Sequence, residues 1–323
     1  MGDGSLFLFF KTRALMILLL TNSGDVTTDI LMPHLTRHAE VFRLNIDLWK
    51  EYMWNIHADG YEISDPLGRV CTEARVGAVY ERKVMFNPMT IDVPAGGSPE
   101  NWLREEVFEI WSGIKDLAYG AGKLALIHPS PSGVWKKMRQ MRLAAKYFPV
   151  PAWQMLHKAT PQIGEQLVCK CNTGLSVGNG RLFNVSRVAP KRIDLEFPWF
   201  LQQAVDAVSD VTVAYINGRL FASEYSRAGM QGMDCRKPTA EGKGEWTPCE
   251  LSADEAARVR AMMAETGFTF SRLDFLRTAD GTLHFLEFNV NGQYAWIDIL
   301  NKRGMLTAIA DEVARVHNRN LPQ

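Results

Sequence analysis

The chain has 323 residues, of which 46% are hydrophobic, so it is long enough to bury a core spread over two or three lobes. Its 36 basic and 36 acidic side chains balance, which excludes the broad positive surface of general nucleic-acid binders. No apolar run approaches the about 20 residues that span a bilayer, so we expect no membrane partner.

Five cysteines are scattered through the chain at spacings that are not typical of a zinc site, and we expect reduced thiols in a cytoplasm. Two apolar runs, 6–10 and 14–20, flank Lys11 and Arg13 but lead into residues 21–25 without a small-residue cleavage site. We therefore expect a cytoplasmic protein in which residues 1–14 are an extension.

Strands and helices alternate from residue 16 to residue 127. This alternation predicts a mainly parallel sheet, and we place an N-terminal domain at 1–127. The predicted elements are strands at 16–21, 40–45 and 123–127, short apolar segments at 61–64, 70–74 and 78–80, and helices at 28–37 and 102–120.

The pattern changes at residues 128–133, where His-Pro-Ser-Pro-Ser-Gly is typical of a linker between domains. We expect a central lobe at 128–197. Its predicted elements are a basic helix at 134–148 and a hairpin of strands 163–171 and 182–188, joined by a loop of Gly, Asn and Ser residues at 172–180.

A C-terminal lobe is predicted at 198–323, which makes the fold class α/β (α+β). The dipeptide Asn-Gly at 217–218 lies between two apolar runs and is a strong signal for a tight hairpin turn. The predicted elements are strands at 200–205, 211–216 and 219–224, a polar surface loop at 226–247, helices at 253–266 and 303–316, and two further apolar runs at 268–276 and 283–288.

The last two apolar runs carry acidic residues. The dipeptide Asp-Gly at 280–281 predicts a two-residue hairpin loop between them. Counting back along both strands sets Asp274 opposite Glu287 and Arg272 opposite Asn289. Two carboxylates at one place on a buried sheet repel each other, and a divalent cation is the simplest remedy. Acidic residues that merely face water are the alternative.

Carboxylate and amide oxygens at alternating positions suit Mg²⁺, so we predict Asp274, Glu287 and Asn289 as metal ligands. Arg272 points to the same face of its strand as Asp274. A guanidinium there would stabilise charge on a transferred phosphoryl group, although a structural salt bridge would look identical in the sequence.

Two lysines are candidates for binding phosphate as point charges. Lys170 ends the strand before the glycine-rich loop, whose backbone N–H groups offer further donors. Lys137 lies in the basic helix after the linker. An ordinary strand-end lysine and a solvated helix face are the alternatives. No G-x-x-x-x-G-K-[ST] motif occurs, so the predicted nucleotide site is not a P-loop.

The order of these elements resembles the ATP-grasp superfamily, and within it the ligases that cyclise ribosomal peptides, the microviridin or graspetide type. The most specific likeness is the run Glu-Phe-Asn-Val-Asn-Gly-Gln-Tyr-Ala-Trp at 287–296, since an Asn-Gly-Gln-aromatic tail after the metal strand looks like this group. Segments 16–29, 42–45, 79–82 and 137–151 are similar to the N-terminal opening, the second strand, the end of the first lobe and the helix that opens the ATP-grasp core.

The resemblance implies ATP and Mg²⁺ as cofactors. It also implies an ATP-grasp fold with a mainly parallel pre-ATP-grasp domain, a central lobe and an antiparallel C-terminal lobe that holds the metal. The implied contacts are Lys137 and Lys170 with ATP phosphates, the backbone around Gln202, Gln203, Ala204 and Val205 with adenine, Asp274, Glu287 and Asn289 with Mg²⁺, and Arg272 and Lys170 with the reacting groups.

Enzymes of the type that this chain resembles phosphorylate a substrate carboxylate, and a hydroxyl or amine then attacks the acyl phosphate to give an ester or amide. The implied partner is a ribosomal precursor peptide with a leader and a core, and a homodimer is implied as well. Residues 226–247 are a candidate leader-docking surface, with a plain surface loop as the alternative.

One departure from the resemblance concerns an arginine. Thr212 stands where the family's Asp-x-Arg pattern has its arginine. Either Arg272, Arg219 or Arg227 takes over its role, or the substrate is handled differently. Lys136 likewise replaces a common asparagine.

The leading hypothesis is an ATP-dependent carboxylate–amine or carboxylate–alcohol ligase that installs side-chain crosslinks in a ribosomal precursor peptide. A ligase that joins small molecules, or adds amino acids to a peptide or protein terminus, is the alternative. A catalytically silent ATP-sensing or peptide-binding module is a third hypothesis, which the complete set of Lys170, Asp274, Glu287 and Asn289 argues against.

Overall fold

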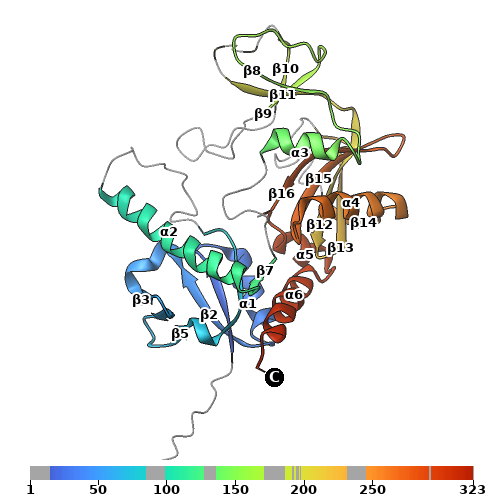
Figure 1. Cartoon of the computed structure of the whole chain (residues 1–323). Coiled ribbons are helices and arrows are strands. Elements are labelled where there is room, and N and C mark those ends of the chain that lie inside the picture. Colours follow the sequence, from blue (N-terminus) through green and yellow to red (C-terminus); the bar gives the residue numbers. More distant parts are fainter. Residues whose placement is uncertain are drawn as a thin grey trace, which may run out of the picture. The chain divides into compact units, whose positions relative to one another are not determined.

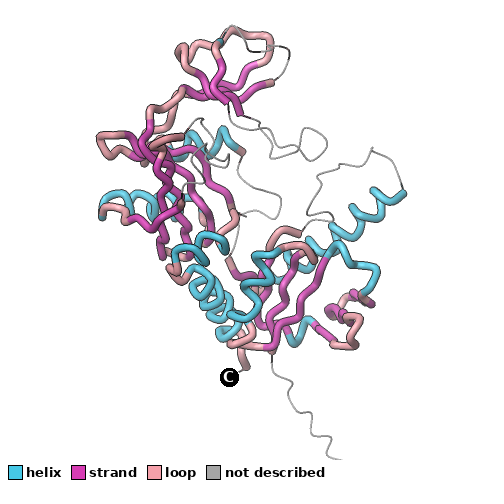
Figure 2. The backbone as a smooth tube through the Cα atoms, turned by 180° about the vertical axis from the view of Figure 1, so that it is seen from behind, coloured by secondary structure: helices cyan, strands magenta, loops and turns pink. Residues whose placement is uncertain are grey.

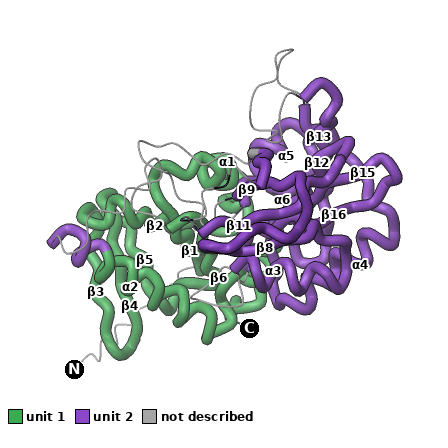
Figure 3. The backbone as a smooth tube through the Cα atoms, turned by 90° about the horizontal axis from the view of Figure 1, so that it is seen from above, with its two compact units in different colours: residues 1–86, 105–125, 310–323 green, residues 87–104, 126–309 purple. Residues whose placement is uncertain are grey.

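The chain separates into two compact units, shown in different colours in Figure 3. The predicted division into three lobes stays a prediction. No helix in the part of the chain that the structure describes is long and apolar enough to cross a bilayer. The first unit comprises Met1–Phe86, Glu105–Ala125 and Ala310–Gln323, and the second comprises Asn87–Arg104 and Leu126–Ile309. The computed structural model describes residues 15–84, 99–126, 136–170, 186–190, 193, 196, 198–230, 245–290 and 292–322.

The first unit is built on a four-stranded parallel sheet, as the sequence predicted (Figure 1). Its elements are β1 (Met16–Thr21), α1 (Val26–Leu35), β2 (Glu40–Asn45), β6 (Val76–Glu81), most of α2 (Pro99–Gly120) and β7 (Leu124–Ala125). The strand order is β2-β1-β6-β7. Every residue of β1 is buried, which explains its unbroken apolar sequence, because a strand covered on both faces has no reason to alternate.

A smaller antiparallel sheet follows in the same unit. It consists of β3 (Met53–His57), β4 (Gly60–Ser64) and β5 (Val70–Thr72), flanked by short 3₁₀ helices at Ile46–Glu51 and Glu73–Arg75. The sequence did not predict β3. Most of its side chains are exposed, so it lacks the apolar alternation that marks a half-buried strand.

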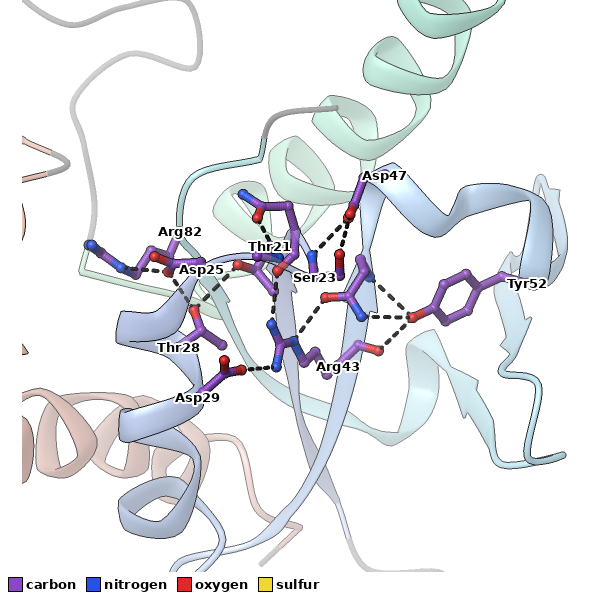
Figure 4. A network of polar contacts seen from close by, with 12 residues as sticks. Thr21, Ser23, Asp25, Thr28, Asp29, Arg43, Asp47, Tyr52 and Arg82 are labelled. Carbon is purple, nitrogen blue, oxygen red and sulfur yellow. Dashed lines mark hydrogen bonds and ion pairs between the residues drawn. The ribbon is translucent and has the colours of Figure 1, made fainter. Parts of the chain in front are cut away.

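A network of polar side chains lies at the carboxyl ends of β1 and β6 (Figure 4). Asp25 and Arg82 form an ion pair of 2.8 Å in which both side chains are almost fully buried, at 2% and 1% exposure. Thr28 donates to the same Asp25 carboxylate at 2.7 Å, and Arg43 donates to Asp29 nearby. These acids and cations satisfy one another, so we assign the network a role in stabilising the fold.

The described residues of the second unit form two sheets, whose strands are magenta in Figure 2. The strand pairings make both sheets antiparallel. The first, with strand order β10-β9-β11-β8, consists of β8 (Trp153–Leu156), β9 (Leu167–Lys170), β10 (Ser186–Val188) and β11 (Trp199–Gln203). The second, with order β14-β13-β12-β15-β16, consists of β12 (Ala207–Ile216), β13 (Arg219–Ser226), β14 (Trp246–Cys249), β15 (Phe270–Thr278) and β16 (Leu283–Asn289). The predicted Asn-Gly turn between β12 and β13 is confirmed by the pairing of Ile216 with Arg219.

The helices α3 (Lys137–Ala144) and α4 (Ala253–Thr266) of the second unit pack on the five-stranded sheet. The same unit contains α5 (Ala295–Asn301) and the beginning of α6 (Met305–Arg319), and α6 belongs to the first unit from Ala310 on. Met141 of α3 and Met262 of α4 share a core with Phe275 of β15 and Phe288 of β16. The predicted helix 253–266 is confirmed residue for residue. It begins with a capping box and ends at a glycine in the left-handed conformation, and both are signals that the sequence carries.

Candidate active site

The hairpin of β15 and β16 brings two carboxylates together. Asp274 pairs with Glu287 and Arg272 pairs with Asn289, so the predicted pairing is confirmed. The predicted two-residue loop is wrong. Thr278 donates from its backbone N–H to Thr282, which leaves a three-residue loop at 279–281.

A bulge in β16 explains how the pairing survives the longer loop. The register shifts by one residue between Asp274 and Phe275, because Phe275 faces Phe285 while Asp274 faces Glu287, and Leu286 is the extra residue. The loop itself closes on Gly281, whose φ of +87° is the left-handed conformation expected at the end of a three-residue hairpin loop. The two deviations cancel, and both acids reach the same place on the sheet.

Lys137, the first residue of α3, contacts one of these acids. Its Nζ donates to Glu287 Oε2 at 2.6 Å and lies 5.9 Å from the centre of the Phe200 ring. The helix is fixed to the edge strand by Gln140, which accepts a hydrogen bond of 3.1 Å from the backbone N–H of Phe288. Lys137 and Gln140 are three residues apart and therefore lie on the same face of α3. The hydrogen bond of Gln140 to β16 thus holds this face, with Lys137, next to Glu287.

Asp274 is held by two donors. Thr212 Oγ1 donates to its Oδ1 at 2.8 Å, and Arg272 donates to its Oδ2 at 3.2 Å. Arg272 also donates to the backbone carbonyl of Gln293 at 3.0 Å. The chain can pass this close because residue 292 is glycine, since a Cβ there would lie 2.7 Å from the Cβ of Arg272. The glycine of the Asn-Gly-Gln signature therefore has a physical reason, its close packing on Arg272.

Lys170 approaches the same acids from β9, in the antiparallel four-stranded sheet of the second unit. Its neighbour Cys169 lies in an apolar cluster on one face, so the lysine points to the other, as predicted. Burial lowers the pKa of Lys170 to about 8, and Lys137 acts in the same direction, while Glu287 and Asp274 oppose the shift. An anionic ligand beside Lys170 would oppose this shift and stabilise the charged form of the lysine.

The electrostatic balance at Glu287 favours its ionised form. Burial raises the pKa of this carboxyl, but the charges of Lys137 and Lys170 outweigh it, and the pKa lies below its ordinary value. The protein thus compensates both acids with its own groups. Repulsion between them, which motivated the metal prediction, does not by itself require a metal ion.

The donor set nevertheless fits Mg²⁺ that arrives with a nucleotide. Asp274 and Glu287 supply hard carboxylate oxygens, and Asn289 is exposed at the end of β16. Among the described residues, no group of three or more His, Cys, Asp and Glu side chains is gathered closely enough to hold a metal ion. Two carboxylates and an amide suit a cation that keeps waters and binds substrate phosphates, as Mg²⁺ does, rather than a structural metal.

The predicted adenine segment lies at the end of β11. The backbone N–H groups of Gln203 and Ala204 already donate to the carbonyls of Ala152 and Gln166, so they are not available to a base. Gln202 is buried, and its Oε1 has no hydrogen-bond partner among the described residues.

Of the three arginines considered as substitutes for the expected one, Arg272 contacts Asp274. Arg227 instead forms a two-pronged ion pair with Asp210, both contacts at 2.8 Å, and Arg219 donates to the carbonyl of Ala308.

Several predicted features lie outside the described residues. They are the linker at 128–133, the glycine-rich loop at 172–180, Asn291 and most of the polar loop at 226–247.

No family model matches the sequence, and no curated protein matches it either. Solved structures match over nearly the whole chain. The macrocyclase MdnC bound with precursor peptide MdnA, from Microcystis aeruginosa MRC, is 16% identical with a TM-score of 0.72 and covers 93% of this chain and 100% of its own. A Chryseobacterium gregarium RiPP-associated ATP-grasp ligase, in complex with ADP and a leader and core peptide, is 15% identical with a TM-score of 0.69, over 96% and 98% of the two chains. The ATP-grasp ligase PsnB complexed with minimal precursor, Mg and ADP is 16% identical with a TM-score of 0.70, over 93% and 97%.

These likenesses show that the chain has the ATP-grasp fold. The predicted fold class is confirmed, with a mainly parallel N-terminal sheet followed by two antiparallel sheets. The resemblance to ligases that act on ribosomal peptides is confirmed as a likeness of structure.

Proposed function

We propose that this chain is an ADP-forming ligase that activates side-chain carboxylates of a ribosomally made precursor peptide as acyl phosphates and forms ester or amide crosslinks. The observation that carries the proposal is a pair of salt bridges, Lys137 with Glu287 and Arg272 with Asp274. The two acids pair with each other on adjoining strands. The fold that holds them is shared with ligases crystallised with ADP and precursor peptides.

The chemistry follows from the weakness of a carboxylate as an electrophile. A carboxylate oxygen of the peptide attacks the γ-phosphorus of ATP, and ADP leaves. A hydroxyl or amine then attacks the acyl carbon, loses its proton to solvent and expels phosphate. Catalysis of such phosphoryl transfer consists of positioning and of charge neutralisation, which is what a cluster of cations beside two acids supplies.

Each residue of the cluster has a role in the proposal. Mg²⁺ held by Asp274, Glu287 and Asn289 would neutralise phosphate charge. If Glu287 held the metal ion, Lys137 would be free to contact phosphate oxygens, and a phosphate beside Lys170 would favour the charged form of that lysine. Arg272 stabilises charge on the transferred phosphoryl oxygens from beside Asp274.

The base of the nucleotide lies, in this proposal, at the end of β11. The buried Oε1 of Gln202 is an acceptor that the amino group of adenine would satisfy. Because the N–H groups of Gln203 and Ala204 are engaged, other backbone groups of the segment, including those of Val205, would make the remaining contacts.

The proposed partner is a precursor peptide with a leader and a core, and the proposed assembly is a homodimer in a cytoplasm. The peptide partner is supported by the similar solved structures that hold a precursor peptide or a leader and core peptide. The mass of the purified chain in solution, measured by light scattering, tests the dimer.

Co-expression with short open reading frames encoded beside this gene, followed by mass spectrometry of the peptides, tests the function. Loss of one water for each crosslink, with peptide-dependent release of ADP, supports the proposal. Gain of mass by residue addition would favour the alternative ligase that extends a terminus. Absence of both mass changes and of peptide-dependent ADP release would contradict the proposal and favour a silent binding module.

A further inference from the structure

Thr212 places a buried hydroxyl in an otherwise apolar stretch of β12. Its neighbours Val211 and Val213 point into the core shared with α3 and α4, so Thr212, which is 3% exposed, points to the opposite face. The antiparallel register sets it directly opposite Asp274, to which its Oγ1 donates at 2.8 Å. The same oxygen lies 3.4 Å from the carbonyl of Leu273, a longer and weaker contact.

The two oxygens of Asp274 therefore receive different donors, a neutral hydroxyl on Oδ1 and a guanidinium on Oδ2. Two donors on opposite oxygens fix the rotation of the carboxylate about its Cβ–Cγ bond. Each oxygen retains a further lone pair for a cation. Thr212 orients the group without adding a positive charge that would compete with a metal ion.

We propose that Thr212 is a positioning residue for Asp274, holding its carboxylate in the orientation in which it ligates Mg²⁺. This inference rests on the proposed function. A side chain of the same shape without a hydroxyl would leave Oδ1 of Asp274 without this donor, so the carboxylate could rotate. We expect the affinity for Mg²⁺ to fall as a result. Loss of a hydrogen-bond partner of a metal ligand typically lowers metal affinity by about 10–100-fold.

The test is calorimetric titration of the full chain with ADP, in the presence and absence of Mg²⁺. Thr212→Val keeps the shape of the side chain and removes the hydroxyl. We expect the gain in ADP affinity that Mg²⁺ provides to fall by about tenfold, with the affinity for ADP alone unchanged. Thr212→Ser restores the donor and is expected to recover the gain.

Thr278→Val is the matched control. It also removes a hydroxyl of β15 that donates to an acid, Asp280, but that contact is exposed and lies at the hairpin loop. We expect the response of this variant to Mg²⁺ to equal that of the parent chain.

Two outcomes would overturn the inference while leaving the proposed function standing. One is a Thr212→Val variant that keeps the whole Mg²⁺-dependent gain, or a loss that serine does not restore. The other is an equal fall in ADP affinity with and without Mg²⁺, which would mean that the hydroxyl supports the local fold instead of orienting the ligand. A parent chain that binds no ADP, or binds it without response to Mg²⁺, would contradict the proposed function itself.

Discussion

The two paired acids of β15 and β16, Asp274 and Glu287, each have a protein cation beside them before any ligand enters. Lys137 contacts Glu287 at 2.6 Å, and Arg272 contacts Asp274 at 3.2 Å. In the proposed reaction Lys137 can bind phosphate only when Glu287 pairs with another cation in its place. We therefore expect metal ion and nucleotide to bind together, each raising the affinity for the other.

Glu287→Gln removes the charge that this exchange needs while keeping the size of the side chain. We expect ADP formation to fall by about 100-fold or more, because an amide is a weaker ligand for Mg²⁺ and no longer pairs with Lys137. Steady-state release of ADP, with circular dichroism as a check of the fold, measures the effect.

Glu265→Gln is the control for this variant. Glu265 also forms an ion pair with a lysine, Lys146, and its side chain has the same 39% exposure as Glu287. We expect its ADP formation to match the parent. Full turnover in Glu287→Gln would show that this carboxylate holds no metal ion.

Lys170 provides a prediction on pH. Burial places its pKa at about 8 in the folded chain, against an ordinary value of 10.5. Between these values the unfolded chain binds more protons at this site than the folded chain, so the contribution of Lys170 to stability rises with pH across that interval. Acetylation of Lys170, followed by mass spectrometry as a function of pH, is expected to show a midpoint near 8 in the folded protein and near 10.5 in urea. Equal midpoints in the two states would contradict the placement of this side chain.

At the scale of elements, the hairpin shows how local and tertiary signals combine. The Asp-Gly dipeptide predicted the turn, and apolar alternation predicted the strands, but neither signal distinguishes a two-residue loop from a three-residue loop followed by a bulge. The pairing of Asp274 with Glu287 was therefore predicted correctly through two deviations that cancel.

Other elements were predicted correctly where their signals are local, and were missed where those signals are weak or where the feature depends on tertiary contacts. The strand β2 and the helix α4 match their predicted bounds, since apolar periodicity and capping residues are signals within the element itself. The helix α5 was missed because it has only seven residues and its N-cap residue, Tyr294, makes no side-chain cap. The contact of Thr212 with Asp274 depends on the pairing of β12 with β15, which are separated in sequence by a hairpin and a helix, and no local pattern encodes that pairing.

Gly292→Ala tests the packing of the segment after β16. The added Cβ would meet the Cβ of Arg272 at 2.7 Å and the backbone carbonyl oxygen of Asn289 at 3.2 Å. Overpacking of this kind costs about 1–3 kcal/mol, which urea unfolding measures as a fall in the free energy of unfolding.

Gly113→Ala is the matched control, since a Cβ at this exposed position of α2 meets nothing within 4 Å. An alanine inside a helix is expected to be neutral or to stabilise by up to about 1 kcal/mol. If Gly292→Ala were as stable as Gly113→Ala, the close approach to Arg272 would be wrong.

The polar network at the ends of β1 and β6 makes a separate prediction for the first unit. Asp25→Ala leaves the guanidinium of Arg82 buried without its acid, and breaking a buried pair in this way costs about 3–5 kcal/mol. Glu40→Ala breaks the exposed pair of Glu40 with Arg75 in the same unit, which is expected to cost less than about 1 kcal/mol. Urea unfolding of the two variants checks the contrast, and similar losses in both would contradict the burial of Asp25.

At the scale of the whole molecule, the candidate site is assembled from separate elements of the second unit. Lys170 comes from the antiparallel four-stranded sheet, Lys137 from α3, and the acids from β15 and β16 at the edge of the five-stranded sheet. The two acids are marked by the local pattern of the hairpin, but neither lysine belongs to a P-loop or to another short motif that would link it to them. The fold is shared with solved structures that are only 13–18% identical, so the likeness of architecture persists where little of the sequence is shared.

The most direct test of this account is a crystal structure of the chain with ADP and Mn²⁺ in place of Mg²⁺, in which anomalous scattering locates the metal ion. We predict an anomalous peak between the carboxylates of Asp274 and Glu287, in contact with ADP phosphate oxygens, and Lys137 turned from Glu287 toward the nucleotide. A peak elsewhere, or bound ADP with no metal ion at these carboxylates, would contradict the central claim that this hairpin holds the metal of an ATP-dependent ligase.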